Sequence, residues 1–129
     1  MNLKNKSEIN LSAAELLHDK CLFPVVAHCT YYSCLQLMRY IWQNKMERNP
    51  DDLKTKSEEK IGSHAKLING IIEFLKDKKI DHREFNNKIL QLKAIRVKAD
   101  YKDIQIDYTA SSKSIQYSKE ILKILKKAI

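Results

Sequence analysis

Arg96 lies at a position where an apolar side chain is expected. The apolar stripe around it consists of Phe85, Ile89, Leu92 and Ala99. At about 100° per helical residue, Arg96 falls within about 20° of the centre of this stripe. Burial of an unpaired guanidinium costs several kcal/mol. Arg96 therefore needs an acceptor inside the protein, or a cleft or partner where a ligand supplies one.

The sequence leaves two explanations of Arg96 open. In the structural one, the guanidinium pairs with Asp100, four residues further on, or with a tyrosine hydroxyl of the preceding apolar helix. In the functional one, it binds a phosphate group or stabilises a charged transition state in a groove. Arg39 lies about 20° from Tyr32 around its helix, so it is expected to line the same groove. The spacing does not decide between the two explanations.

The residue types give little support for a metal site, a phosphate loop or a cofactor site. The histidines are His18, His28, His64 and His82. No two of them are four residues apart on one helix with carboxylate support, so a metal site is not expected. Two glycines cannot build a phosphate loop, and the sequence indicates no cofactor. The three cysteines lack CxxC spacing, which predicts reduced thiols in a cytoplasmic protein.

The N-terminal residues and the most apolar segment argue against export and membrane insertion. Residues 1–10 are polar and contain no apolar run that resembles a signal peptide. The apolar segment 21–42 includes His28, Gln36 and Arg39, which are costly in hydrocarbon. We therefore expect this segment to be the buried central helix of a bundle rather than a membrane span.

The net charge of +8 is concentrated in the second half of the chain. Residues 1–64 contain 9 basic and 8 acidic side chains, whereas residues 65–129 contain 15 and 8. Such a bias suits a polyanionic partner, and it favours nucleic acid over a membrane. Lysines on the solvent-exposed face of a helical bundle are also common when they serve only solubility.

Composition and periodicity predict a single all-α domain over residues 1–129, with its core at about 11–126 and about five helices in an antiparallel up-and-down bundle. The first helix is expected from a capping box at Ser12 to about Lys20, and the second from Pro24 to about Met46. Residues 47–57 are expected to be a connection. Helices capped by Ser63, Asp81 and Thr109 follow, and an extended connection at residues 101–108 precedes the last one.

Several segments resemble the HEPN family, the helical domains named for higher eukaryotes and prokaryotes and for nucleotide binding. They are AAELLHDK, AHCTYYSCLQLMRYIW, the Gly62-Ser63-His64 turn, IRVKADY and a final helix rich in lysine. They occur in the family's order over about residues 11–126. The resemblance implies an antiparallel bundle that pairs with a second copy, so that a groove forms between the protomers.

Family members that cleave RNA have an arginine, four to six intervening residues and then a histidine. The arginine corresponds to Arg96, but the histidine positions hold Tyr101, Lys102 and Asp103. Because the ordinary pKa of a tyrosine is about 10, this residue type is a poor general base at neutral pH. The resemblance thus implies that Asp100 orients Arg96 and that Tyr101 contacts phosphate or the partner chain.

Two functions therefore stand as hypotheses. In the first, the chain is a dimeric module that binds RNA or a nucleotide without strong nuclease activity, or associates with a nucleotidyltransferase or another antitoxin-like partner. Its binding residues are Arg96, Arg39, Lys93, Lys98 and Lys102. In the second, it is a metal-independent endoribonuclease in which His64 or Tyr101 replaces the missing histidine. His64 can do so only if its helix, or the partner chain, brings it near Arg96.

Overall fold

The structure, a computed structural model, describes residues 2–54, 62–101 and 105–129. Five α-helices and one short 3₁₀-helix account for most of these residues, and the described ranges contain no strand. The helices are α1 (Leu3–Asp19), α2 (Phe23–Asn44), η1 (Pro50–Leu53), α3 (Ser63–Asp77), α4 (His82–Ala99) and α5 (Tyr108–Lys127). The expected all-α bundle is confirmed. None of the described helices is both long and apolar enough to cross a membrane.

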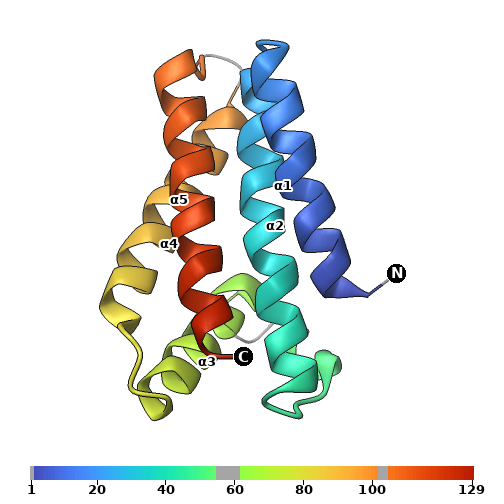
Figure 1. The fold of residues 1–129 in the computed structure, drawn as a ribbon, viewed down its shortest axis with the longest axis vertical. Coiled ribbons are helices and arrows are strands. Elements are labelled where there is room, and N and C mark those ends of the chain that lie inside the picture. Colours follow the sequence, from blue (N-terminus) through green and yellow to red (C-terminus); the bar gives the residue numbers. More distant parts are fainter. Residues whose placement is uncertain (1, 55–61, 102–104) are drawn as a thin grey trace.

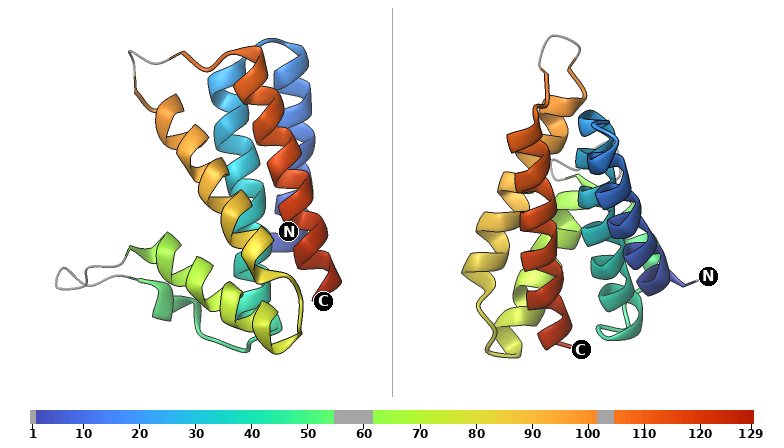
Figure 2. Two further views of the ribbon diagram at one scale, coloured as in Figure 1. Left: turned by 90° about the vertical axis from the view of Figure 1, so that its left-hand side faces the viewer. Right: turned by 45° about the horizontal axis from the view of Figure 1, so that its top comes forward.

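Helix α2 lies in the middle of the bundle. It packs against α1, α3, α4, α5 and η1, as its apolar circumference predicts. Figure 1 shows α1 and α5 on the same side of the molecule with α2 between them. Figure 2 shows α4 beside α2 and α5, and α3 lying obliquely across the far end of α2. Side chains on different faces of α2 therefore meet different helices.

Helix α1 begins nine residues before the predicted capping box. Its N-cap is Asn2, whose side-chain oxygen accepts a hydrogen bond from the backbone N–H of Asn5 at 2.9 Å. The prediction of a cap at Ser12 is wrong, because Ser12 lies inside the helix. Residues 3–11 lack an apolar stripe, but the buried Ser7 donates to the backbone oxygen of Ser33 on α2 at 2.6 Å. This polar contact holds the early part of α1 in place.

The other predicted helix starts were partly right. Asp81 caps α4, as predicted, by accepting from the backbone N–H of Glu84 at 3.1 Å. The predicted cap at Ser63 is wrong. The N-cap of α3 is Gly62, so no side chain caps this helix, and Ser63 is its first residue. The predicted cap at Thr109 is also wrong. Asp107 caps α5 by accepting from Ala110 at 2.8 Å, and an ionised carboxylate is the stronger acceptor.

The two predicted connections are only partly described. In the first connection, residues 50–53 form η1. Asn49 caps this helix by accepting a hydrogen bond from the backbone N–H of Asp51 at 2.9 Å. Residues 55–61 lie outside the described ranges. In the second connection, residues 101 and 105–107 belong to no helix or strand, whereas residues 102–104 lie outside the described ranges.

Buried serines allow α5 to pack closely against its neighbours. Ser111, Ser114 and Ser118 of α5 are fully buried. Ser114 donates to the backbone oxygen of Ser111 at 2.7 Å, and Ser118 donates to that of Ile115 at 2.8 Å. The Ser111 hydroxyl is hydrogen-bonded to Nδ1 of His18 on α1 at 2.8 Å. Because all three hydroxyls have partners, these small residues can be buried at low cost.

Gly70 fixes α3 against α2 at the position of Trp42. A Cβ atom at Gly70 would lie 2.5 Å from Cζ3 of the Trp42 indole. The indole is held on its other edge, where Nε1 donates to the backbone oxygen of Asn49 at 3.0 Å, and the Arg48 guanidinium lies 4.8 Å from its ring centre. The small residue is therefore required by the close approach of the two helices.

Gly70→Ala is expected to lower the free energy of unfolding by about 1–3 kcal/mol, because the added methyl group overpacks the Trp42 contact. This loss exceeds the helix-propensity gain of about 0.5–1 kcal/mol from replacing a helical glycine. Urea denaturation measures the difference. Asn69→Ala is the control, since Asn69 is an exposed residue of α3 next to Gly70. Equal stability of Gly70→Ala and the wild type would show that Trp42 moves aside freely.

Candidate functional site

Arg96 extends from the last turn of α4 toward α2. Its side chain is 22% exposed, so it is neither sealed in the core nor spread into solvent. The guanidinium carbon lies 5.3 Å from the ring centre of Tyr31 and 5.7 Å from that of Tyr32. Both distances fall within the range of cation–π attraction. The tyrosine pair of α2 therefore contacts Arg96 through its ring faces rather than through a hydroxyl.

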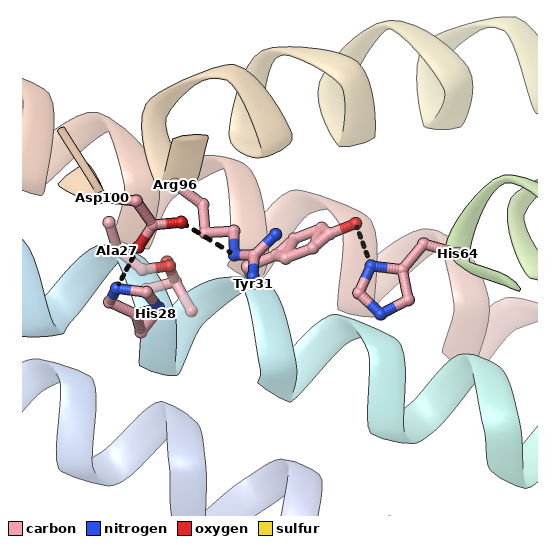
Figure 3. Close-up of polar contacts among 7 residues, drawn as sticks. Ala27, His28, Tyr31, His64, Arg96 and Asp100 are labelled. Atoms are coloured by element: carbon pink, nitrogen blue, oxygen red, sulfur yellow. Dashed lines mark hydrogen bonds and ion pairs between the residues drawn. The ribbon is translucent and has the colours of Figure 1, made fainter. Parts of the chain in front are cut away.

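Asp100 connects Arg96 to a histidine of α2. Its Oδ2 lies 3.9 Å from Nε of Arg96, and its Oδ1 lies 2.8 Å from Nε2 of His28. The predicted pair of Arg96 and Asp100 is thus present, but it is too long to be a hydrogen bond. Asp100 is 45% exposed, so solvent screens the pair. Figure 3 shows the carboxylate between the imidazole and the guanidinium.

The guanidinium of Arg96 retains unused donors. Its Nε is buried, yet no acceptor among the described residues is within hydrogen-bonding distance of it. A buried donor without a partner is uncommon and costs about 1–3 kcal/mol. An anion can approach the exposed part of the guanidinium directly, and it would reach Nε and remove that cost only by displacing a neighbouring side chain.

Tyr31 links Arg96 to His64, the second residue of α3. The Tyr31 hydroxyl and Nδ1 of His64 are hydrogen-bonded at 3.3 Å, with the donor set by the imidazole tautomer. Burial raises the pKa of Tyr31 to about 12, although the nearby Arg96 opposes the shift. The hydroxyl therefore stays protonated at neutral pH. Figure 3 shows the resulting chain from His28 through Asp100, Arg96 and Tyr31 to His64.

The electrostatic surroundings keep His64 neutral. Burial lowers the pKa of His64 below its ordinary value of 6.5, and the positive charges of Arg39, Arg96 and Lys93 lower it further. All three cations are therefore close enough to act on the imidazole. The imidazole is therefore unprotonated at neutral pH and available as a base, although the same cations lower its proton affinity.

The structure brings together only part of the predicted site. Arg96, Arg39, Lys93, Asp100 and His64 belong to one neighbourhood. Lys98 does not, because it lines a separate surface pocket between α4 and α5. Two residues along a helix correspond to about 200° of rotation, so Lys98 and Arg96 face opposite ways.

Two further predicted residues are not placed beside Arg96. Tyr101 follows α4 and is 59% exposed, with its only described hydrogen bond made by its backbone N–H to the oxygen of Lys98. Lys102 lies outside the described residues. Among the described residues, the site is therefore built from helices α2, α3 and α4 and from Asp100, the C-cap residue of α4.

Sequence reasoning missed the parts played by His28 and Tyr31. A signal for the first was available, because His28, Tyr32 and Arg39 are spaced by four and seven residues and fall on one face of a helix. That Tyr31 would reach both Arg96 and His64 depends on the packing of α3 and α4 on α2. This packing cannot be read from spacing within a single helix.

The described residues contain no group of three or more His, Cys, Asp or Glu side chains arranged to hold a metal ion. Comparisons of the chain with protein-family models, with curated proteins and with solved structures found no match. The resemblance to the HEPN family therefore rests on the sequence motifs and stays a prediction.

Arg39→Gln is expected to raise the pKa of His64 toward 6.5, because it removes one of the positive charges that disfavour the imidazolium. An NMR pH titration of the His64 ring protons measures the shift. Arg83→Gln is a matched control, since Arg83 is an exposed arginine at the start of α4 and is not among the charges acting on His64.

The same lowered pKa sets a pH dependence of stability. Unfolded His64 binds a proton near pH 6.5 and folded His64 only at lower pH, so its stabilising contribution is present above pH 6.5 and is lost as the pH falls below it. His64→Gln should therefore lose less stability than the wild type between neutral and mildly acidic pH in urea denaturation. Equal losses in the two proteins would contradict this assignment.

Proposed function

We propose that the chain is a HEPN-like helical module that binds RNA or a nucleotide through a phosphate group at Arg96, without strong nuclease activity. The observation that carries this proposal is the partly exposed guanidinium, whose buried Nε has no acceptor among the described residues. Arginine presents a planar fork of donors that matches two phosphate oxygens. A phosphate would supply the acceptors that Arg96 lacks.

The neighbouring side chains suit the rest of such a ligand. Arg39 and Lys93 add positive charge, as their influence on His64 indicates. Tyr32 is partly buried and forms an edge contact with Tyr31 at 6.0 Å between ring centres. An aromatic ring beside a phosphate-binding arginine favours stacking of an unpaired base, typical of single-stranded recognition. RNA loops or free nucleotides therefore fit better than a duplex.

We further propose that two copies pair beside this site, in the antiparallel up-and-down arrangement of that family. Val25, Val97 and Tyr101 are exposed apolar or aromatic residues on α2, α4 and the segment after α4, close in sequence to the His28–Asp100 contact. A nucleotidyltransferase or other antitoxin-like protein is the alternative partner that the family resemblance implies. A strict monomer in analytical ultracentrifugation at high protein concentration would refute pairing.

Arg96→Ala is expected to weaken binding of a labelled single-stranded RNA by about tenfold or more at low salt. The slope of log affinity against log salt should fall by about one, because one phosphate contact is lost. Fluorescence anisotropy measures both. Arg83→Ala is the matched control, since it removes the same charge from an exposed position on the same helix.

Because Arg96 packs on Tyr31 and Tyr32, circular dichroism must first show that Arg96→Ala is folded. Arg96→Lys is a second variant that keeps the charge and loses the planar fork, so its affinity should fall between those of the alanine variant and the wild type. If Arg83→Ala weakens binding as much as Arg96→Ala does, RNA is held by the overall charge and the proposed site is wrong.

One observation favours a second candidate function, that of a metal-independent endoribonuclease. His64 is hydrogen-bonded to Tyr31, which Arg96 overlies, so α3 does bring a histidine into the neighbourhood of Arg96. In this mechanism the neutral His64 accepts the proton of a ribose 2′-hydroxyl, whose oxygen attacks the adjacent phosphorus, and Arg96 stabilises the pentavalent phosphorane. The P–O5′ bond then breaks, the 5′-oxygen leaves with a proton from water, and a 2′,3′-cyclic phosphate remains. Tyr101 is a less suitable substitute, since it is exposed and makes no side-chain contact with the described residues of the site.

Incubation of a labelled RNA with the protein in EDTA separates the two functions. The binding module leaves the RNA intact. If the RNA is cut, and both Arg96→Ala and His64→Gln abolish cutting, the endoribonuclease is correct and the binding-only proposal is wrong. Cutting that survives both variants would come from a contaminating nuclease or from another site. His82→Gln is the control, since His82 lies at the start of α4 with no described contact to Arg96.

A further inference from the structure

A second cationic surface lies along α1 and α5. It shares no residue with the Arg96 site. Two adjoining surface pockets there share Lys126. The first is a groove lined by Leu11 of α1 and by five residues of α5, which are Lys119, Leu122, Lys123, Lys126 and Lys127. We refer to these six residues as the α1–α5 groove. The second pocket adds Lys4, Lys45 and Tyr40 beside Glu8 and Ile129. Figure 1 shows α1 and α5 on one side of the molecule.

The two walls of this surface differ in charge. All charged residues on the α5 wall are lysines, and all four of them are exposed. The α1 side is mixed in charge, because it carries the carboxylates Glu8 and Glu15 and also the cation Lys4. Glu15 pairs with Lys119 at 3.2 Å, whereas Lys123, Lys126 and Lys127 make no ion pair with any described residue. The positive charge is therefore concentrated along one edge.

Helix stability does not explain all of these lysines. Lys126 and Lys127 lie in the last turn of α5, where positive charge is favourable because of the helix dipole. Lys119 and Lys123 lie one to two turns earlier, beyond the reach of that effect. All four nevertheless share one stripe, at spacings of three, four and seven residues. The stripe runs beside Leu11 and Leu122, which form the apolar floor of the groove.

We propose that the α1–α5 groove binds an amphipathic helix of a protein partner, with its apolar stripe over Leu11 and Leu122 and an acidic flank over the lysines of α5. A helix in a groove buries apolar side chains at positions such as i, i+3, i+4 and i+7. The span from Lys119 to Lys127 corresponds to about 12 Å of helix, which a partner segment of two to three turns covers.

The charge asymmetry favours a protein helix over nucleic acid. A phosphodiester strand is negative along its whole length, so it would be repelled by Glu8 and would compete with Glu15 for Lys119 at the α1 side. A peptide helix can carry carboxylates on the flank facing α5 and neutral or basic side chains on the flank facing α1. The groove itself offers no aromatic ring on which bases could stack. The proposal is independent of the phosphate site at Arg96.

The test uses a fluorescent helical peptide as probe, with a leucine stripe, glutamates on one flank and glutamines on the other. A peptide of the same composition in shuffled order is its control. In fluorescence anisotropy at low salt, the full chain is expected to bind the amphipathic peptide and not the shuffled one. Lys123→Glu should weaken binding by about tenfold. Lys113→Glu, the same change at an exposed lysine of α5 outside the groove, should change affinity less than about twofold.

Each other outcome overturns the proposal. Equal binding of the two peptides, or equal effects of Lys123→Glu and Lys113→Glu, would mean that the lysines act only through net charge. Displacement of the peptide by single-stranded RNA, together with equal loss of RNA and peptide affinity in Lys123→Glu, would assign the groove to nucleic acid. No binding of either peptide would leave the lysines as a solvated surface. Arg96→Ala should not change peptide affinity, so failure of the phosphate site is recognised separately.

Discussion

The contact of the Arg96 guanidinium with the faces of Tyr31 and Tyr32 is the interaction on which the site depends. Burying a cation costs several kcal/mol, and one or two cation–π contacts return about 0.5–2 kcal/mol each. The ion pair with Asp100 adds little, because it is 3.9 Å long and the carboxylate is 45% exposed. The rings thus hold the guanidinium in place, and its buried Nε has no acceptor among the described residues. This arrangement suits the reversible binding of an anion.

This contact depends on the central position of α2 in the bundle. Helix α2 supplies His28, both tyrosines and Arg39, and α4 brings Arg96 and Asp100 against it. Helix α3 contributes His64, and the Gly70–Trp42 contact fixes the approach of α3 to α2. Arg39 and Arg96 both act on His64, so the charges from α2 and α4 converge on the side chain that α3 supplies. No single helix therefore carries the whole set of groups, and only the packing of the three helices makes a site.

The sequence predicted the helices well where apolar periodicity is strong. The apolar circumference of α2 and the cap at Asp81 are correct because both signals are local. The start of α1 was misplaced, since Ser7 holds that segment through a polar contact with Ser33 that no apolar pattern reveals. The stripe position of Arg96 left open whether the guanidinium pairs with Asp100, bonds a tyrosine hydroxyl or faces a groove, and the structure contains the pair with Asp100 at 3.9 Å. Its contact with two tyrosine faces, and the link through Tyr31 to His64, depend on distances between helices.

The most direct test of the account follows the Nε–H resonance of Arg96 by NMR while a short single-stranded RNA is added. The account predicts a saturable downfield shift of this proton and slower exchange with water, because a phosphate oxygen becomes its acceptor. The Nε–H of Arg48, whose guanidinium lies over Trp42, provides the internal comparison and should change little. If RNA binds while the Arg96 resonance stays unchanged, the guanidinium is only a packing residue and the proposed site is wrong.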